Sequence, residues 1–141
     1  VNKLVVPSFV FSREEFIAGV PILEKLAEYD VCLIVLAGFM NKISDVILQA
    51  FPGKIVNIHP ALLPKYGGKG MYGMHVHEAV VKAGERESGI TIHYINEHYD
   101  EGAIIFQASC PVLPSDTPEE VASKVHALEY AHYPHVIESL L

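Results

Sequence analysis

The 141-residue sequence is long enough for one domain with a sizeable core, and 50% of its residues are hydrophobic. A formal net charge of −7 and ten scattered Lys and Arg residues argue against a nucleic-acid surface, because phosphate binding needs clustered cations. Two dispersed cysteines, short apolar runs and no signal-peptide pattern argue against a disulfide scaffold, a membrane span and a secreted protein. We expect a soluble, cytoplasmic domain that handles small molecules, with no nucleic-acid or membrane partner.

A capping box predicts the first helix. Ser12 is followed three residues later by Glu15, a pair that satisfies the first backbone N–H groups of a helix. Gly19 and Pro21 should kink or split this helix, because proline lacks an N–H and glycine weakens helices.

A strand, a helix and a strand follow in that order. Val31 to Leu36 is a continuous apolar run, typical of a strand that is buried on both faces of a parallel sheet. Ser44 should cap a short helix, and Lys54 to Ile58 should form the next strand. The pattern predicts an α/β fold, a doubly wound, mostly parallel twisted sheet of the Rossmann-like kind.

The second half of the chain adds two helices and two strands. His75 to Ala83 reads as a helix, and strands are expected at Gly89 to Ile95 and Ala103 to Ala108. The last helix should begin after Thr117, which has the pattern of an N-cap followed by proline and two glutamates. Pro134 should interrupt it.

Asn57 and His59 form the first candidate site. Strand side chains alternate, so the two residues should project from the same face of their strand. An amide donor beside an imidazole suits chemistry at a carbonyl carbon, where the amide stabilises an oxyanion and the imidazole moves a proton. The alternative interpretation is a strand end whose polar side chains satisfy backbone groups of the following loop.

Asp100 forms a second candidate, in the turn between the last two expected strands. By default the Asp-x-Gly pattern of Asp100 to Gly102 is a β-turn. A carboxylate from this loop could also reach His59, where it would favour the protonated imidazolium and fix its tautomer.

The remaining histidines give weaker signals. His75 and His77 have a metal half-site spacing, but positions i and i+2 of a helix do not share a face, so we expect no metal site. We expect surface or capping roles for His93, His98, His126, His132 and His135.

Glu129 falls toward the buried edge of the last helix, and a half-buried carboxylate needs a partner. The residues leave two partners open, a lysine or the ammonium group of a ligand.

Taken together, separated motifs in the same order resemble the phosphoribosylglycinamide formyltransferase family of purine biosynthesis. The resemblance runs nearly from end to end and rests on Ala37 to Met40, Asn57 to Tyr66, Gly89 to Tyr94, Asp100 to Gly102 and Glu129 to Pro134.

This resemblance implies transfer of a formyl group from 10-formyltetrahydrofolate, the co-substrate, to the amine of glycinamide ribonucleotide, without a metal. By matching motifs, the catalytic set would be Asn57, His59 and Asp100. Asn57 and protonated His59 would stabilise the oxyanion, His59 would help to protonate the departing folate nitrogen, and Asp100 would keep His59 charged and orient a water.

The resemblance also assigns the substrate contacts. The folate would contact Arg13, Met40, Asn41, Lys42, Ile43, Asn57, Asn96, Glu97, His98, Tyr99 and Asp100. The ribonucleotide would contact His126, Ala127, Leu128 and Glu129, with Glu129 meeting the amine.

The sequence differs from the family at its start, where the family has a first strand and a Gly-rich phosphate-binding loop. We therefore expect residues 1–141 to form a single formyltransferase domain that lacks the N-terminal phosphate-binding segment. Two other functions remain open: formyltetrahydrofolate deformylase, a hydrolase with the same framework, and a non-catalytic folate- or nucleotide-binding fragment. The sequence does not predict the oligomeric state.

Overall fold

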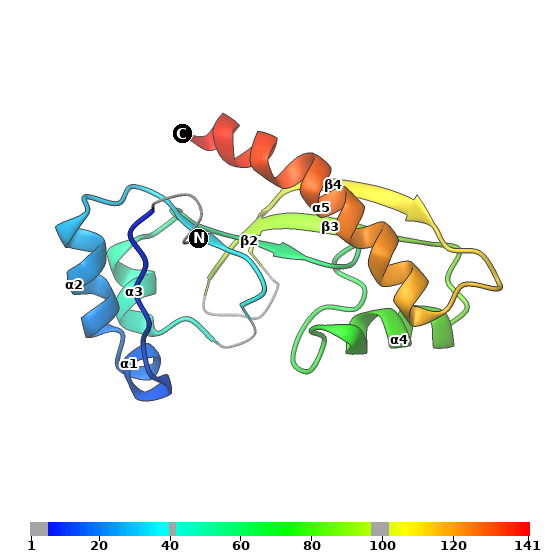
Figure 1. Cartoon of the computed structure of the whole chain (residues 1–141), viewed down its shortest axis with the longest axis horizontal. Coiled ribbons are helices and arrows are strands. Elements are labelled where there is room, and N and C mark those ends of the chain that lie inside the picture. Colours follow the sequence, from blue (N-terminus) through cyan, green and yellow to red (C-terminus); the bar gives the residue numbers. More distant parts are fainter. Residues whose placement is uncertain (1–5, 40–41, 97–101) are drawn as a thin grey trace.

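The computed structural model describes residues 6–39, 42–96 and 102–141, whose arrangement is shown in Figure 1. In chain order the elements are α1 (Arg13–Ala18), α2 (Val20–Glu28), β1 (Ile34–Leu36), α3 (Asp45–Ala50), β2 (Ile55–His59), α4 (Met74–Lys82), β3 (Glu87–Tyr94), β4 (Ile104–Pro111) and α5 (Pro118–Leu140).

The four strands form one sheet in the order β1-β2-β3-β4. The pair β1 and β2 is parallel, but β2 and β3 are antiparallel, and so are β3 and β4. The prediction of a mostly parallel sheet is therefore wrong for the described strands, which form a mixed sheet. A short connection joins β3 to β4, and it cannot hold the crossover that a parallel pair needs.

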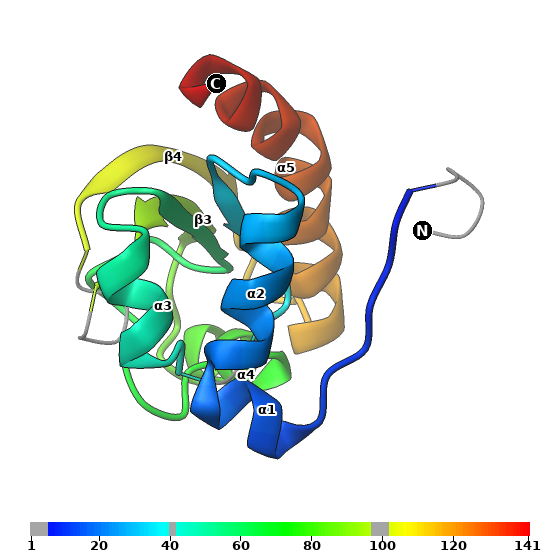
Figure 2. The ribbon, with the colours of Figure 1, turned by 90° about the vertical axis from the view of Figure 1, so that its left-hand side faces the viewer.

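Helices cover both faces of this sheet, as expected. On the Ile55 face, residues of α2 and α3 pack against β1 and β2. On the Ile58 face, α5 and α4 pack against β3 and bury Val80, Val121 and Val125. Figure 1 shows α5 lying along β3 and β4. In the same view α1, α2 and α3 lie at the left end of the molecule and α4 lies toward the right. Figure 2 shows α2 and α3 side by side.

The first strand departs from the prediction. It is shorter than expected, and Val35 at its centre is 38% exposed although the sequence predicted burial on both faces. The cause is its place in the sheet: in the described part of the chain β1 pairs with β2 on one side and forms an edge of the sheet.

The helix starts follow the local signals. Ser12 and Glu15 form the predicted capping box, and Gly19, in the left-handed region at φ +78°, separates α1 from α2. Thr117 and Glu120 form the same kind of box at the start of α5. Ser44 occupies the N-cap position of α3 as predicted, but its side chain makes no capping hydrogen bond.

The prediction that Pro134 interrupts the last helix is wrong, because α5 continues through it to Leu140. A proline inside a helix removes one hydrogen bond and crowds the preceding turn. Here Tyr133 is buried in the core just before it, and Val136 and Ile137 pack against the same core just after it. This packing on both sides outweighs the local cost.

No helix among residues 6–39, 42–96 and 102–141 has the length and apolar character to cross a membrane.

Replacement of the exposed Pro134 tests this explanation. Pro134→Ala should increase the free energy of unfolding by up to about 3 kcal/mol, since alanine restores the missing N–H without losing core contacts. Urea denaturation measures the change. The matched control is Pro118→Ala at the first position of the same helix, where proline is well accommodated and no gain is expected. A destabilised Pro134→Ala protein would show that the helix depends on its proline.

Candidate active site

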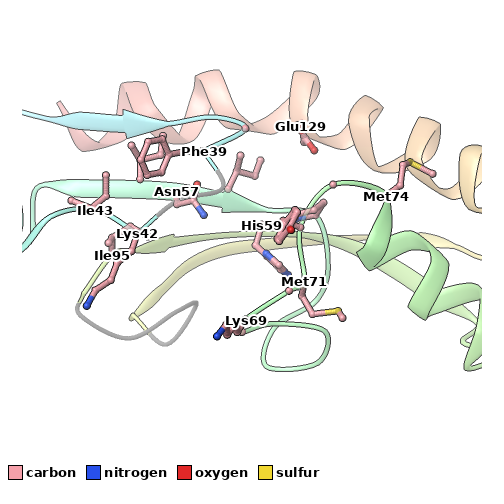
Figure 3. Close-up of a pocket in the computed structure, with 18 of the residues that line it drawn as sticks. Phe39, Lys42, Ile43, Asn57, His59, Lys69, Met71, Met74, Ile95 and Glu129 are labelled. Atoms are coloured by element: carbon pink, nitrogen blue, oxygen red, sulfur yellow. The ribbon is translucent and has the colours of Figure 1, made fainter. Parts of the chain in front are cut away.

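A cavity of about 560 Å³ lies beyond the carboxyl ends of β1 and β2. In open α/β sheets this is where ligands bind. Figure 3 shows Asn57 and His59 projecting from β2 into it, with Glu129 of α5 pointing toward them from above. The loop between β2 and α4 contributes Lys69 and Met71, and Phe39 and Ile43 form part of an apolar wall.

His93 orients the amide of Asn57. The register of β2 and β3 places the two residues directly opposite each other. The Nδ1 atom of His93 lies 3.0 Å from the carbonyl oxygen of Tyr94 and must donate to it, which leaves Nε2 as an acceptor. The Nδ2 atom of Asn57 lies 3.5 Å from this Nε2. One amide N–H of Asn57 is thus directed at His93, and the second can serve a ligand in the cavity.

His59 is held by the loop that follows it. It is 4% exposed, and its Nε2 donates a hydrogen bond of 2.7 Å to the carbonyl oxygen of Tyr66. Tyr66 adopts a left-handed backbone conformation, at φ +58°, and its side chain packs against the core. Because a carbonyl can only accept, this contact fixes a proton on Nε2 of His59. The alternative interpretation of a polar strand end is thus partly right, since His59 also satisfies a backbone group.

Thr91 anchors the start of the same loop. It is fully buried and lies opposite His59 in the sheet register. Its hydroxyl accepts a hydrogen bond of 3.0 Å from the Leu63 N–H and donates one of 2.7 Å to the Ala61 carbonyl. Gln107 of β4 donates to the Leu63 carbonyl and to the Thr91 hydroxyl. The loop that places the Tyr66 carbonyl beside His59 is therefore hydrogen-bonded to two strands, β3 and β4.

Glu129 provides a carboxylate on the far side of the cavity. Its side chain is 25% exposed, and its Oε1 lies 3.5 Å from Nδ1 of His126, one turn earlier on α5. Burial raises the pKa of the Glu129 carboxyl, and nearby His126 offsets part of this effect. Among the described residues the ion-pair partner of Glu129 is His126 and not a lysine.

The predicted site residues fall into three groups. Lys42, Ile43, Asn57, His59, Asn96, His126 and Glu129 all line the cavity. Three others do not: Arg13 is exposed at the start of α1, Ala127 is exposed on α5, and Leu128 packs against the core. The rest lie outside the described residues, namely Met40, Asn41, Glu97, His98, Tyr99 and Asp100.

One histidine was predicted wrongly, and another has a position that the sequence did not indicate. His93 was expected at the surface but is fully buried beside Asn57. His77, considered for a metal, is 2% exposed and lines the cavity, while His75 is exposed on another face of α4. The feature that could have indicated a site role for His93 is its position in the strand that follows the Asn57 strand along the chain, since consecutive strands often pair. Within the described ranges, no group of three or more His, Cys, Asp or Glu side chains could hold a metal ion.

Comparisons with known proteins agree on one family. The sequence profile of the family described as formyl transferase matches residues 6–137. The chain is 42% identical to the chloroplastic phosphoribosylglycinamide formyltransferase of Arabidopsis thaliana over 140 residues, and 40% identical to the Haemophilus influenzae enzyme of the same name over 137 residues. It is also similar to the crystal structure of glycinamide ribonucleotide transformylase 1 from Geobacillus kaustophilus, with a TM-score of 0.89 and 36% identity.

The alignments cover most of the length of this chain but a smaller share of the length of each relative. The alignments include 99% of the chain and 48% of the Arabidopsis protein, and 94% of the chain and 62% of the Haemophilus protein. The structural match includes 99% of the chain and 74% of the Geobacillus chain. The chain thus spans about half to two thirds of the length of these two curated relatives.

The contact between His93 and Asn57 gives a prediction about stability. His93→Phe keeps a ring of similar size but removes both nitrogens, so the Asn57 amide loses its acceptor. The free energy of unfolding should fall by roughly 1–3 kcal/mol. Denaturant unfolding measures this, with His132→Phe as the control because the His132 ring packs on Phe106 away from the cavity. Equal effects of the two substitutions would argue against the assigned contact.

Burial of Glu129 predicts a pH-dependent stability. The pKa of Glu129 is higher in the folded state than in the unfolded state. The protein therefore has its full stability below the ordinary carboxyl pKa of about 4.3, and it loses stability as pH rises from there through the raised pKa. Glu129→Gln should therefore be more stable than the wild type at pH 7, and the difference should shrink as pH falls toward 4.5. The control is Glu138→Gln at an exposed position of α5. A Glu129→Gln protein that is less stable at pH 7 would contradict this.

Proposed function

Because the chain belongs to the formyl transferase family, we propose that it transfers the formyl group of 10-formyltetrahydrofolate to the amine of 5-phosphoribosylglycinamide in purine biosynthesis. One observation carries the proposal: Asn57 and His59 line one side of a single cavity and Glu129 lines the other. An amide and an imidazole suit the reacting carbonyl, and a carboxylate suits the amine that attacks it.

The β2 side of the cavity performs the carbonyl chemistry. When the amine attacks the formyl carbon, negative charge develops on the formyl oxygen. The amide N–H of Asn57 that is not directed at His93 stabilises this charge. His59, protonated, donates to the same oxygen and then helps to protonate the folate nitrogen as the carbon–nitrogen bond breaks. Asp100 acts on His59, keeping it charged and orienting a water.

The folate occupies the part of the cavity with apolar walls. Phe39, Ile43 and Ile95 line this part and suit a flat ring system, while Lys42 and Asn96 provide polar groups at its margin. The further folate contacts that we propose are Arg13, Met40, Asn41, Glu97, His98, Tyr99 and Asp100.

The ribonucleotide approaches from α5. Glu129 holds its amine, and His126 contacts the same substrate from one turn away. Ala127 and Leu128 contribute through the backbone of this segment, since their side chains do not line the cavity. The reaction as proposed uses no metal and involves no nucleic acid or membrane. A cytoplasmic location remains a prediction, and two of the similar plant proteins are named as chloroplastic.

The proposed function is tested by following both possible products. A full-length protein that includes residues 1–141 should convert 10-formyltetrahydrofolate and 5-phosphoribosylglycinamide to tetrahydrofolate and the formylated ribonucleotide. Release of free formate without the ribonucleotide would instead indicate a deformylase. Binding of either substrate without turnover would indicate a non-catalytic module.

The role of Asn57 gives a quantitative prediction for the same assay. Removal of one oxyanion donor typically costs roughly 100- to 1,000-fold in rate, so Asn57→Ala should lower kcat by about that factor. KM for both substrates should change far less, because the contact strengthens in the transition state. Unchanged kcat with a raised KM would assign Asn57 to ground-state binding.

A further inference from the structure

His77 is a buried imidazole with an unused nitrogen at the wall of the active-site cavity. It lies on α4, is 2% exposed and lines the cavity. Its Nδ1 is buried and has no hydrogen-bond partner, one of three such side-chain atoms in the described part of the chain. An unsatisfied buried polar atom costs free energy, so it needs a reason. At a cavity wall, the simplest reason is a group supplied by the substrate.

The surroundings of His77 favour its neutral form. Its ring meets the ring of His126 edge-on, with 6.5 Å between centroids. Burial lowers the pKa of His77, and the nearby imidazoles of His126 and His59 lower it further. Among the described residues, the other charged or titratable groups that line its cavity are His59 from β2, His126 and Glu129 from α5, and Lys42, Lys69 and Tyr72 from the loops. His77 thus lies among the residues that hold the carbonyl and those that hold the amine.

We infer that His77 is the base that takes the proton from the attacking amine, an inference that rests on the proposed function. Formyl transfer must move a proton from the amine nitrogen to the folate nitrogen. Protonated His59 can supply a proton to the folate nitrogen, but the same group cannot accept one from the amine in that step. A second, neutral imidazole between the two halves of the cavity meets this need.

The proton and electron balance of the step is as follows. The lone pair of the neutral amine forms a bond to the formyl carbon, and the carbonyl π electrons move to oxygen. The amine nitrogen, now bonded to the formyl carbon, carries a positive charge. An unprotonated ring nitrogen of His77 removes one of its protons. The oxyanion then re-forms the carbonyl, the bond from carbon to the folate nitrogen breaks, and His59 protonates that nitrogen. His77 ends protonated and His59 neutral, and proton exchange with water resets both.

A structural histidine is the alternative explanation, and His77→Gln separates the two. Glutamine keeps a polar side chain that can hydrogen-bond but cannot take up a proton. We expect kcat to fall at least 100-fold, within the usual range of roughly 10²- to 10⁴-fold for general acid–base catalysis, with KM for both substrates nearly unchanged. The acid limb of the pH–rate profile that reports ionisation of His77 should disappear. Added imidazole should partly restore the rate of His77→Ala.

The matched control is His75→Gln, two residues earlier on the same helix but exposed and outside the cavity lining, which should keep wild-type kcat. Thermal unfolding checks that His77→Gln is folded, and NMR titration of the wild type should show His77 titrating below the usual histidine pKa of about 6.5. A kcat for His77→Gln within threefold of wild type, or His77 titrating at or above 6.5, would overturn the inference and leave the proposed function intact. A folded full-length wild type that transfers no formyl group would refute both.

Discussion

The antiparallel pairing of β2 with β3 is the constraint on which the site depends. Its register sets His93 opposite Asn57 and Thr91 opposite His59. The first pair orients the amide, and Thr91 anchors the loop whose Tyr66 carbonyl fixes a proton on His59. A slip of one residue would turn both of these candidate catalytic side chains to the other face of the sheet, and it would break all of these contacts together. The geometry of this candidate site is thus a consequence of strand pairing, not of the loop alone.

The long last helix completes the site from the other side. It packs along β3 and β4 and carries Glu129 to the cavity, while Tyr133, one turn further on, donates a 2.7 Å hydrogen bond to the Leu36 carbonyl at the end of β1. Burial and the nearby Glu129 carboxylate raise the pKa of the Tyr133 phenol, so it stays a donor. A helix that ended at Pro134 would lose the packing of the following turns that holds this residue in place. Continuity through Pro134 therefore serves the site as well as the core.

Local signals predicted most of the elements, because a capping box such as that of Thr117 and Glu120 depends on residues three positions apart. Strand direction, burial and side-chain partners depend on residues far apart in the sequence, and these were the points where the predictions failed. His93 resembles a surface residue until its strand is paired with β2, and His77 resembles half of a metal site until its helix is docked on α5. The proposed role of Asp100 stays a prediction, because that residue lies outside the described part of the chain.

The most direct test of the account is a crystal structure of the protein with 5-phosphoribosylglycinamide and a 10-formyltetrahydrofolate analogue that cannot release its formyl group. We predict that the formyl oxygen lies about 2.7–3.2 Å from Nδ2 of Asn57, and that the amine lies between the Glu129 carboxylate and the formyl carbon. Binding of the formyl group away from Asn57 and His59, or of the amine away from Glu129, would contradict the claim that this cavity brings the two substrates together.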